Sequence, residues 1–408
     1  MSVIVEHWGK YLCDIFENKR KNGKMDKEND ECTLFSNLPI DILIIIVSLL
    51  PRKDMRSLLK TSKTFNSLKR MLVLRAMWLV CHHPENALVS AAACYDRIGH
   101  FQPPELIRQV LNILEQKRMT CITSRVPLAI VAGRLDMTET IVQKILAIFS
   151  LSHKSGTLSA ENASIEATSA VISACKIGNM TALGLLLVDT FVVNSLIKRD
   201  INPLTQLCKS NHTEIVKEIL TNTKFENASI WIKHNDCYGF ISGSPLSMAC
   251  SNGNSELVDL LLSKGSPIQD DKGHYQTGNA LHAAVAVQGL LQGDMKGCVL
   301  KILEHAKKDN TLDIKKFVNT QSSGTRMTPL HYLGRNCDPL LVSESAQTQQ
   351  IVDVFRVLCD HGADLTILDC KGILPLNTED FEHYFNTHVL PLKQADFNSP
   401  LQDGLSPF

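Results

Sequence analysis

The first strong pattern of apolar and polar positions predicts two helices within residues 34–68. Apolar residues recur at helical spacing between Pro39, which suits the first turn of a helix, and Pro51, which ends it. Ser36 or Asn37 can cap this first helix, and Asp54 can cap the second. The apolar face of the second helix is formed by Leu58, Leu59, Phe65 and Leu68.

The first of these helices is apolar nearly all round. Ile44, Ile45 and Val47 point away from the face that carries Ile42, Leu43 and Ile46. A helix of this kind suits burial between its own domain and a partner. Its apolar run, Ile42–Leu50, has nine residues, and a membrane-spanning helix needs roughly 20. We therefore expect no membrane span here.

A second pattern repeats along the rest of the chain. In residues 244–273 a turn opens a short helix, Gly253 closes it, Leu257–Leu262 forms a second helix, and Gly265 begins the connection to the next unit. The start of the short helix recurs with steps of 33 and 35 residues in two places and of 40 to 49 elsewhere, so the array carries insertions. The recurring positions are Ala87, Pro127, Ala170, Pro203, Pro245, Ala280, Pro329 and Pro375.

Two inner positions support the same register. Eight residues after the recurring position stand Gly178, Asn211 and Gly253, at a helix end that favours a left-handed backbone. Five residues after it stand Cys175, Cys208 and Cys250, where helix packing requires a small apolar side chain.

These units resemble ankyrin repeats, whose signature is T-P-L-H-x-A with a period of about 33 residues. The resemblance implies an all-α fold in which about seven units at residues 84–378 stack, because no single unit can bury its own apolar face. His282 and His331 occupy the signature histidine position, where the family uses the imidazole to hydrogen-bond neighbouring turns. Residues 379–408 are expected to form a short cap at Phe381–Phe385 and an irregular tail.

Residues 34–68 resemble an F-box within a module that we place at residues 34–80. The shared features are the opening Leu38-Pro39, the Leu- and Ile-rich helix and the Leu50-Pro51-x-x-Asp54 step; Met55 and Phe65 replace the leucine and tryptophan that are usual. By resemblance, the residues that face the Skp adaptor are Leu38, Pro39, Ile42, Leu43, Ile46, Leu50 and Leu58. An alternative is that the two helices simply cap the first ankyrin unit.

Composition favours a cytoplasmic protein. The 408 residues include 42 basic and 42 acidic side chains, a balance that provides no field to attract nucleic acid or a membrane. The 13 cysteines include no Cys-x-x-Cys pair, which favours reduced thiols over disulfides or a zinc site. Residues 1–33 carry no secretory signal pattern: residues 1–16 can form an amphipathic helix, and residues 17–31 form a charged linker.

Motifs of the common enzyme classes are absent, so we expect no catalytic residues, cofactor or metal. The sequence has no phosphate-binding loop, no His-Glu-x-x-His helix and no Gly-x-Ser-x-Gly elbow. Cys81-His82-His83 is the densest thiol and imidazole cluster, and we interpret it as a loop between the F-box and the repeats rather than a metal or thiol site.

Insertions in a repeat array fall on one face and often carry recognition. Three lie between paired helices, at Cys94–Pro104, Gln288–Gly297 and Asn336–Gln349. A fourth, Asn222–Gly243, contains the target-binding candidates Trp231, Tyr238 and Phe240. Alternatively, Trp231 fills the groove between the fourth and fifth units.

The domain order resembles ankyrin-repeat F-box proteins, which implies a substrate-recognition subunit of an SCF-type ubiquitin ligase. The F-box would bind the Skp adaptor and through it a cullin, while the repeats bind the target. The chain also resembles ankyrin F-box effectors that intracellular bacteria inject into host cells, which would place it in the host cytoplasm. Two alternatives stay open: an ankyrin adaptor that recruits no ligase, and a thiol-dependent transferase in the inserted loops.

Overall fold

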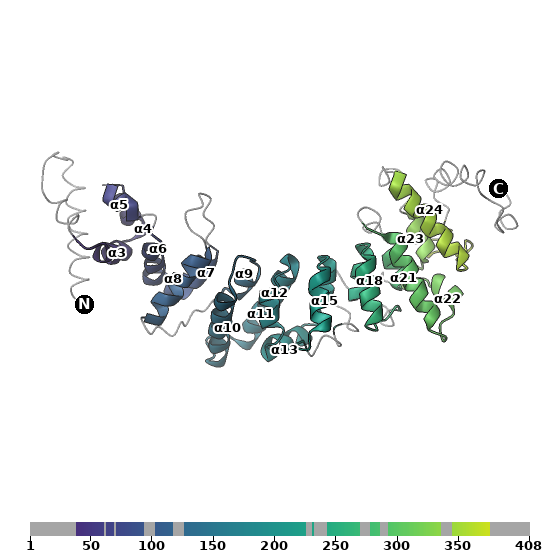
Figure 1. Cartoon of the computed structure of the whole chain (residues 1–408), viewed down its shortest axis with the longest axis horizontal. Coiled ribbons are helices and arrows are strands. Elements are labelled where there is room, and N and C mark those ends of the chain that lie inside the picture. Colours follow the sequence, from purple (N-terminus) through teal and green to yellow (C-terminus); the bar gives the residue numbers. More distant parts are fainter. Residues whose placement is uncertain are drawn as a thin grey trace. The chain divides into compact units, whose positions relative to one another are not determined.

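The computed structural model shows a chain of helices (Figure 1). It describes residues 38–60, 63–68, 71–93, 103–116, 126–225, 231, 243–269, 278–285, 293–335 and 345–375. No strand occurs in these ranges, which confirms the all-α class. The chain divides into two compact units, Met1–Ser195 and Leu196–Phe408, which we call the N-terminal and C-terminal units. The predicted cap at Phe381–Phe385 and the segment 1–33 lie outside the described residues.

In the residues that the structure describes, the N-terminal unit opens with four helices and continues into helix pairs. The first four are α3 (Ile40–Leu49), α4 (Arg52–Leu58), α5 (Lys63–Leu68) and α6 (Leu72–His82). After a short 3-10 turn, the later ones are α7 (Ala87–Ala92), α8 (Pro103–Gln116), α9 (Leu128–Ala132), α10 (Glu139–Lys154), α11 (Ala160–Ile177) and α12 (Met180–Leu186), and α13 (Thr190–Lys198) crosses the boundary between the units. Because the first four helices and the first helix pairs share one unit, the predicted domain boundaries at residues 33, 80 and 84 stay predictions.

The first predicted helix of residues 34–68 is present as α3. The predicted second helix is wrong as a single element, because α4 ends at Leu58 and Phe65 and Leu68 lie in a separate helix, α5. These three helices share an apolar core with α6. Pro39 and Pro51 are the N-cap residues of α3 and α4. Asp54 lies in the first turn of α4 and makes no capping hydrogen bond, so its predicted capping role is wrong. The core residues are Leu43, Ile44, Val47, Leu50, Leu58, Leu59, Leu68 and Leu74.

A carboxylate from a neighbouring helix caps α9. The residue before this helix is Pro127, whose side chain cannot accept a hydrogen bond. Instead, the backbone N–H of Ala129 donates to Oε1 of Glu166 on α11, at 3.0 Å. Burial raises the pKa of Glu166, and this effect exceeds the opposing effect of hydrogen bonds from the backbone of Ala129 and Leu128. Glu166 therefore satisfies the start of α9, at the cost of burying a charge.

The capping contact of Glu166 predicts different losses of stability for two substitutions of this residue. We expect Glu166→Ala to lower the free energy of unfolding of the N-terminal unit by about 1 kcal/mol, the usual effect of losing a helix cap. Glu166→Gln should have a smaller effect, because its amide oxygen still accepts and no charge is buried. Hydrogen exchange of a peptide covering residues 128–132, at neutral pH, measures the difference. Equal protection in the two variants would show that the carboxylate does not act as the cap.

The C-terminal unit consists of paired helices in the register that the sequence predicts. The first helix of each pair is α14 (Pro203–Lys209), α17 (Pro245–Ser251), α19 (Ala280–Ala284) or α23 (Pro329–Arg335). The second is α15 (Thr213–Thr221), α18 (Ser255–Ser263), α21 (Met295–Lys308) or α24 (Ser345–Asp360), and α22 (Ile314–Val318) follows α21. First helices pack on first helices and second helices on second helices, so consecutive pairs bury their apolar faces against each other.

The predicted inner positions are confirmed in both units. Gly178, Asn211 and Gly253 have φ angles of 73°, 60° and 64°, in the left-handed region. The side chains of Cys175, Cys208 and Cys250 are fully buried. The repeat register read from the sequence is therefore the register of the fold.

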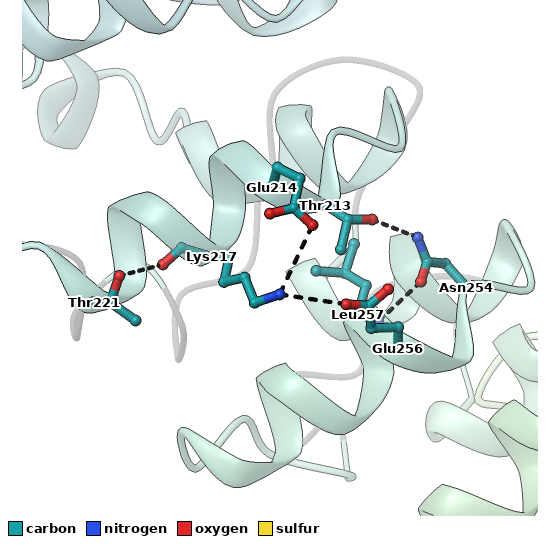
Figure 2. A network of polar contacts seen from close by, with 7 residues as sticks. All are labelled: Thr213, Glu214, Lys217, Thr221, Asn254, Glu256 and Leu257. Atoms are coloured by element: carbon teal, nitrogen blue, oxygen red, sulfur yellow. Dashed lines mark hydrogen bonds and ion pairs between the residues drawn. The ribbon is translucent and has the colours of Figure 1, made fainter.

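Polar side chains join successive pairs as well. Figure 2 shows Asn254, the N-cap of α18, whose Oδ1 accepts from the backbone N–H of Leu257 at 2.9 Å. Its Nδ2 donates to Oγ1 of Thr213 on α15 at 2.7 Å. Beside it, Nζ of Lys217 lies 3.5 Å from Oε1 of Glu256, and this exposed pair contributes little to stability. One amide thus caps its own helix and binds the preceding pair.

No single helix in the described ranges is long and apolar enough to cross a bilayer. Helices α12 and α13 together have the length and apolar composition of a membrane-spanning segment, but the chain bends by 90° between them.

Candidate functional site

Helix α3 has an apolar face directed away from its own core. The inward residues Leu43, Ile44 and Val47 are buried. Opposite them, Ile42 is 42% exposed and Leu49 is 37% exposed, seven residues apart and therefore on the same side of the helix. Ile45 and Ile46, which lie between them at helical spacing, are half-buried. We call Ile42, Ile45, Ile46 and Leu49 the outward stripe.

The seven residues predicted to face an adaptor fall into two groups. Leu38, Pro39, Ile42 and Ile46 retain exposed surface, although Leu38 also packs against the core. Leu43, Leu50 and Leu58 are buried in that core, so their direct contribution is to hold α3 in place. Ile45 and Leu49 were absent from the predicted set. Leu49 lies three residues after Ile46 and seven after Ile42, a helical spacing that could have indicated it, but the division between inner and outer faces depends on α6.

Basic residues flank the outward stripe in sequence. Helix α4 begins just after α3 and exposes Arg52, Lys53 and Arg56, and Lys60 follows its end. The N-cap of α3, Pro39, is exposed, and its carbonyl accepts from the backbone N–H groups of Ile42 and Leu43 at 3.0 and 3.1 Å. An apolar stripe next to a basic helix favours a partner surface that is apolar with an acidic margin.

The structure describes one of the three target-binding candidates, Trp231. Trp231 is 2% exposed, and its backbone carbonyl accepts from Nδ2 of Asn202 at 2.7 Å. This burial agrees with the alternative in which Trp231 fills a groove between repeats. Tyr238 and Phe240 lie outside the described residues. Most of the insertions at Cys94–Pro104, Gln288–Gly297 and Asn336–Gln349 lie outside them too.

The two signature histidines have the structural role that the resemblance implies. Nε2 of His282 donates to the carbonyl oxygen of Met327 at 2.9 Å, and its Nδ1 lies 2.8 Å from Oδ1 of Asn279. Nε2 of His331 donates to the carbonyl oxygen of Ile373 at 3.1 Å. Burial lowers the pKa of both side chains, to about 4 for His282. Each histidine binds a turn of the following repeat.

The interpretation of Cys81-His82-His83 as a loop is wrong. Cys81 and His82 form the end of α6, and His83 is its C-cap residue. Within the described ranges no group of three histidine, cysteine or acidic side chains could hold a metal ion. Burial raises the pKa of the Cys298 thiol to about 12 and of the Cys359 thiol to about 11. A protonated thiol is a poor nucleophile, so neither cysteine suits transferase chemistry.

Models of two known families match segments of the chain. The model of the F-box domain matches residues 35–76, and the model named ankyrin repeats (3 copies) matches residues 171–272. The crystal structure of the human ASB11 ankyrin repeat domain matches with a TM-score of 0.37 and 16% identity, covering 64% of this chain and 97% of that chain. No curated protein matches the sequence. The chain therefore carries an F-box domain followed by ankyrin repeats.

Proposed function

We propose that this chain is the substrate-recognition subunit of an SCF-type ubiquitin ligase. The F-box binds the Skp adaptor, and through it a cullin, while the ankyrin repeats bind the protein to be ubiquitinated. Both domain types are typically interaction modules, so the chain itself breaks no bond. Its contribution is positioning, which raises the effective concentration of a target lysine near the ubiquitin-conjugating enzyme.

The observation that carries this proposal is the outward stripe of α3. A short helix that needed only to close the end of the repeats would present polar residues to water, but α3 presents Ile42 and Leu49. Each apolar side chain that a partner covers contributes on the order of 1 kcal/mol or more to binding. The stripe therefore supports binding of a partner on the side of α3 opposite its own core.

The test uses the full chain and the purified Skp adaptor, with affinity measured by isothermal titration calorimetry. We expect the double variant Ile42→Ala, Leu49→Ala to lose about 2 kcal/mol of binding, roughly 30-fold in Kd. The folding of the unit should be kept, because both side chains lie outside the core. Addition of the cullin to the wild-type complex should give a ternary species on size-exclusion chromatography.

A matched control truncates two exposed apolar side chains elsewhere in the same unit. Leu135 and Leu151 are 68% and 66% exposed, and the variant Leu135→Ala, Leu151→Ala should bind the adaptor as the wild type does. Absence of binding by the wild-type chain would leave the ankyrin adaptor that recruits no ligase. Binding that survives the loss of Ile42 and Leu49 would show that the adaptor does not contact the outward stripe.

A further inference from the structure

The last turn of α3 is held by two side chains of α6. The final carbonyl groups of a helix have no partner within it. Nε1 of Trp78 donates to the carbonyl oxygen of Leu50 at 3.1 Å. Nε2 of His82 lies 3.0 Å from the carbonyl oxygen of Ser48, and since a carbonyl can only accept, this nitrogen carries the hydrogen. Both bonds therefore satisfy carbonyl groups at the end of α3.

Trp78 and His82 act as a pair. They are four residues apart on α6 and so lie on one face of the helix. Their ring centroids are 5.0 Å apart, and the ring of His83 meets Trp78 edge-on at 5.2 Å. This packing restricts both rings, which makes each hydrogen bond to α3 more directional than an exposed side chain could provide.

The residue between the two anchored carbonyl groups is Leu49, the last member of the outward stripe. Ser48 and Leu50 are both buried and bound to α6, while Leu49 between them is directed outward. The orientation of Leu49, and of the chain as it turns at Pro51 into α4, therefore depends on α6 as well as on the core.

Helix α6 also packs against the first helix pair of the repeats. It lies along α8 and contacts α7, and its residues Leu79 and Val80 are buried. Leu74, one turn earlier, belongs to the F-box core. One helix is thus shared by the F-box and the repeats, although the F-box match ends at residue 76.

We propose that Trp78 and His82 are positioning residues for the adaptor-binding helix α3, so that adaptor affinity depends on side chains beyond the matched F-box. This inference rests on the proposed function. Without the two hydrogen bonds, the last turn of α3 frays, and Leu49 no longer occupies a fixed position before the adaptor arrives. The adaptor then has to order that turn on binding, which lowers affinity.

The variants separate the hydrogen bonds from the packing of the rings. Trp78→Phe keeps an aromatic ring beside His82 and removes the indole N–H. His82→Leu removes the donor to the carbonyl oxygen of Ser48, whereas His82→Gln places an amide N–H near the position of Nε2 and should restore this hydrogen bond. In the full chain we expect Trp78→Phe and His82→Leu each to weaken adaptor binding about fivefold, which corresponds to about 1 kcal/mol. His82→Gln should stay within about twofold of the wild type.

Hydrogen exchange of the free chain provides a readout independent of the adaptor. The peptide covering residues 46–51 should exchange faster in Trp78→Phe and His82→Leu and normally in His82→Gln, while the peptides of α8 and α9 stay unchanged. If Trp78→Phe and His82→Leu both bind the adaptor with wild-type affinity, the inference is overturned. Faster exchange throughout the N-terminal unit would overturn it too, since that is the result of a purely structural role.

Failure of the proposed function gives a different result. If the wild-type chain does not bind the adaptor, the ligase role is wrong, but the exchange comparison still decides whether Trp78 and His82 hold α3. Unchanged exchange at residues 46–51 would then overturn the positioning role too, and selectively faster exchange would support it.

Discussion

Replacing Gly253 with alanine is expected to lower the free energy of unfolding of the C-terminal unit by about 3 kcal/mol or more. Gly253 ends α17 with φ at +64°, and a Cβ there would lie 2.6 Å from Cα of Gly293 and 2.9 Å from the backbone nitrogen of Asp294. A left-handed backbone costs an alanine about 1 kcal/mol or slightly more. The remainder comes from backbone contact, because the colliding atoms cannot rotate away as a side chain could.

A hydrogen bond between repeats lies beside this close approach of Gly253 and Gly293. The backbone N–H of Asp294, the N-cap of α21, donates to the carbonyl oxygen of Gly253 at 2.7 Å. Moving the two backbones apart to admit a Cβ would lengthen this bond. Asn254, the next residue, makes the hydrogen bond to Thr213 of the preceding pair that Figure 2 shows. Gly253 therefore lies where three consecutive helix pairs are joined.

Gly265→Ala is the matched control. Gly265 lies in the same unit and has a φ of +83°, but a Cβ there would meet nothing within 4 Å. Gly265→Ala should lower the free energy of unfolding by only about 1 kcal/mol, the cost of placing alanine in a left-handed backbone. Denaturant unfolding followed by the emission of buried Trp231, in a background of Trp8→Phe and Trp78→Phe, reports on this unit alone. Equal losses in Gly253→Ala and Gly265→Ala would contradict close backbone packing between the repeats.

The features of the fold that the sequence predicts correctly are those set by local chemistry. A left-handed helix end favours glycine or asparagine whatever packs around it, so Gly178, Asn211 and Gly253 could be identified from spacing alone. The same holds for the proline that opens α14 or α17, since its ring fixes φ at a value that a helix start accepts. His282 and His331 followed from a family signature whose hydrogen bonds are made to adjacent turns.

The features that sequence reasoning missed depend on residues far away in the chain. The apolar pattern of α3 is nearly continuous, so only contacts with α6 decide that Val47 lies inside and Leu49 outside. The cap of α9 comes from Glu166, 37 residues after Ala129, and not from a residue directly before the helix. Cys81 and His82 belong to α6, and the side chains of Trp78 and His82 on this helix bind the carbonyl groups of Leu50 and Ser48, far earlier in the chain. No local rule contains that information.

Lowering the pH from 7.5 to 5 is expected to reduce the stability of the C-terminal unit by about 2 kcal/mol through His282 alone. In the folded chain burial lowers the pKa of this side chain from 6.5 to about 4, and the nearby His331 acts in the same direction. Hydrogen bonds to backbone carbonyl groups, including that of Met327, oppose this effect but do not cancel it. His282 is therefore neutral in the folded protein throughout this range.

The direction of the effect follows from proton binding. Above the unfolded pKa of 6.5 both states are neutral, and stability does not depend on this residue. As the pH falls below 6.5, the unfolded chain takes up a proton that the folded chain does not, and stability decreases until the pH reaches about 4. Over the whole window the loss is about 3 kcal/mol. The aspartates with lowered pKa values, such as Asp364 and Asp369, act in a more acidic window, below 3.8.

His282→Gln isolates this contribution. The amide N–H of glutamine can replace the donor to Met327, while the group that titrates is removed, so the variant should lose less stability than the wild type between pH 7.5 and 5. Unfolding curves at both pH values give the change in free energy of unfolding for the wild type and the variant. They are again followed by Trp231 in the background that lacks the other two tryptophans. Equal losses of stability in the variant and the wild type would mean that His282 takes up its proton in the folded state, which the burial of its side chain opposes.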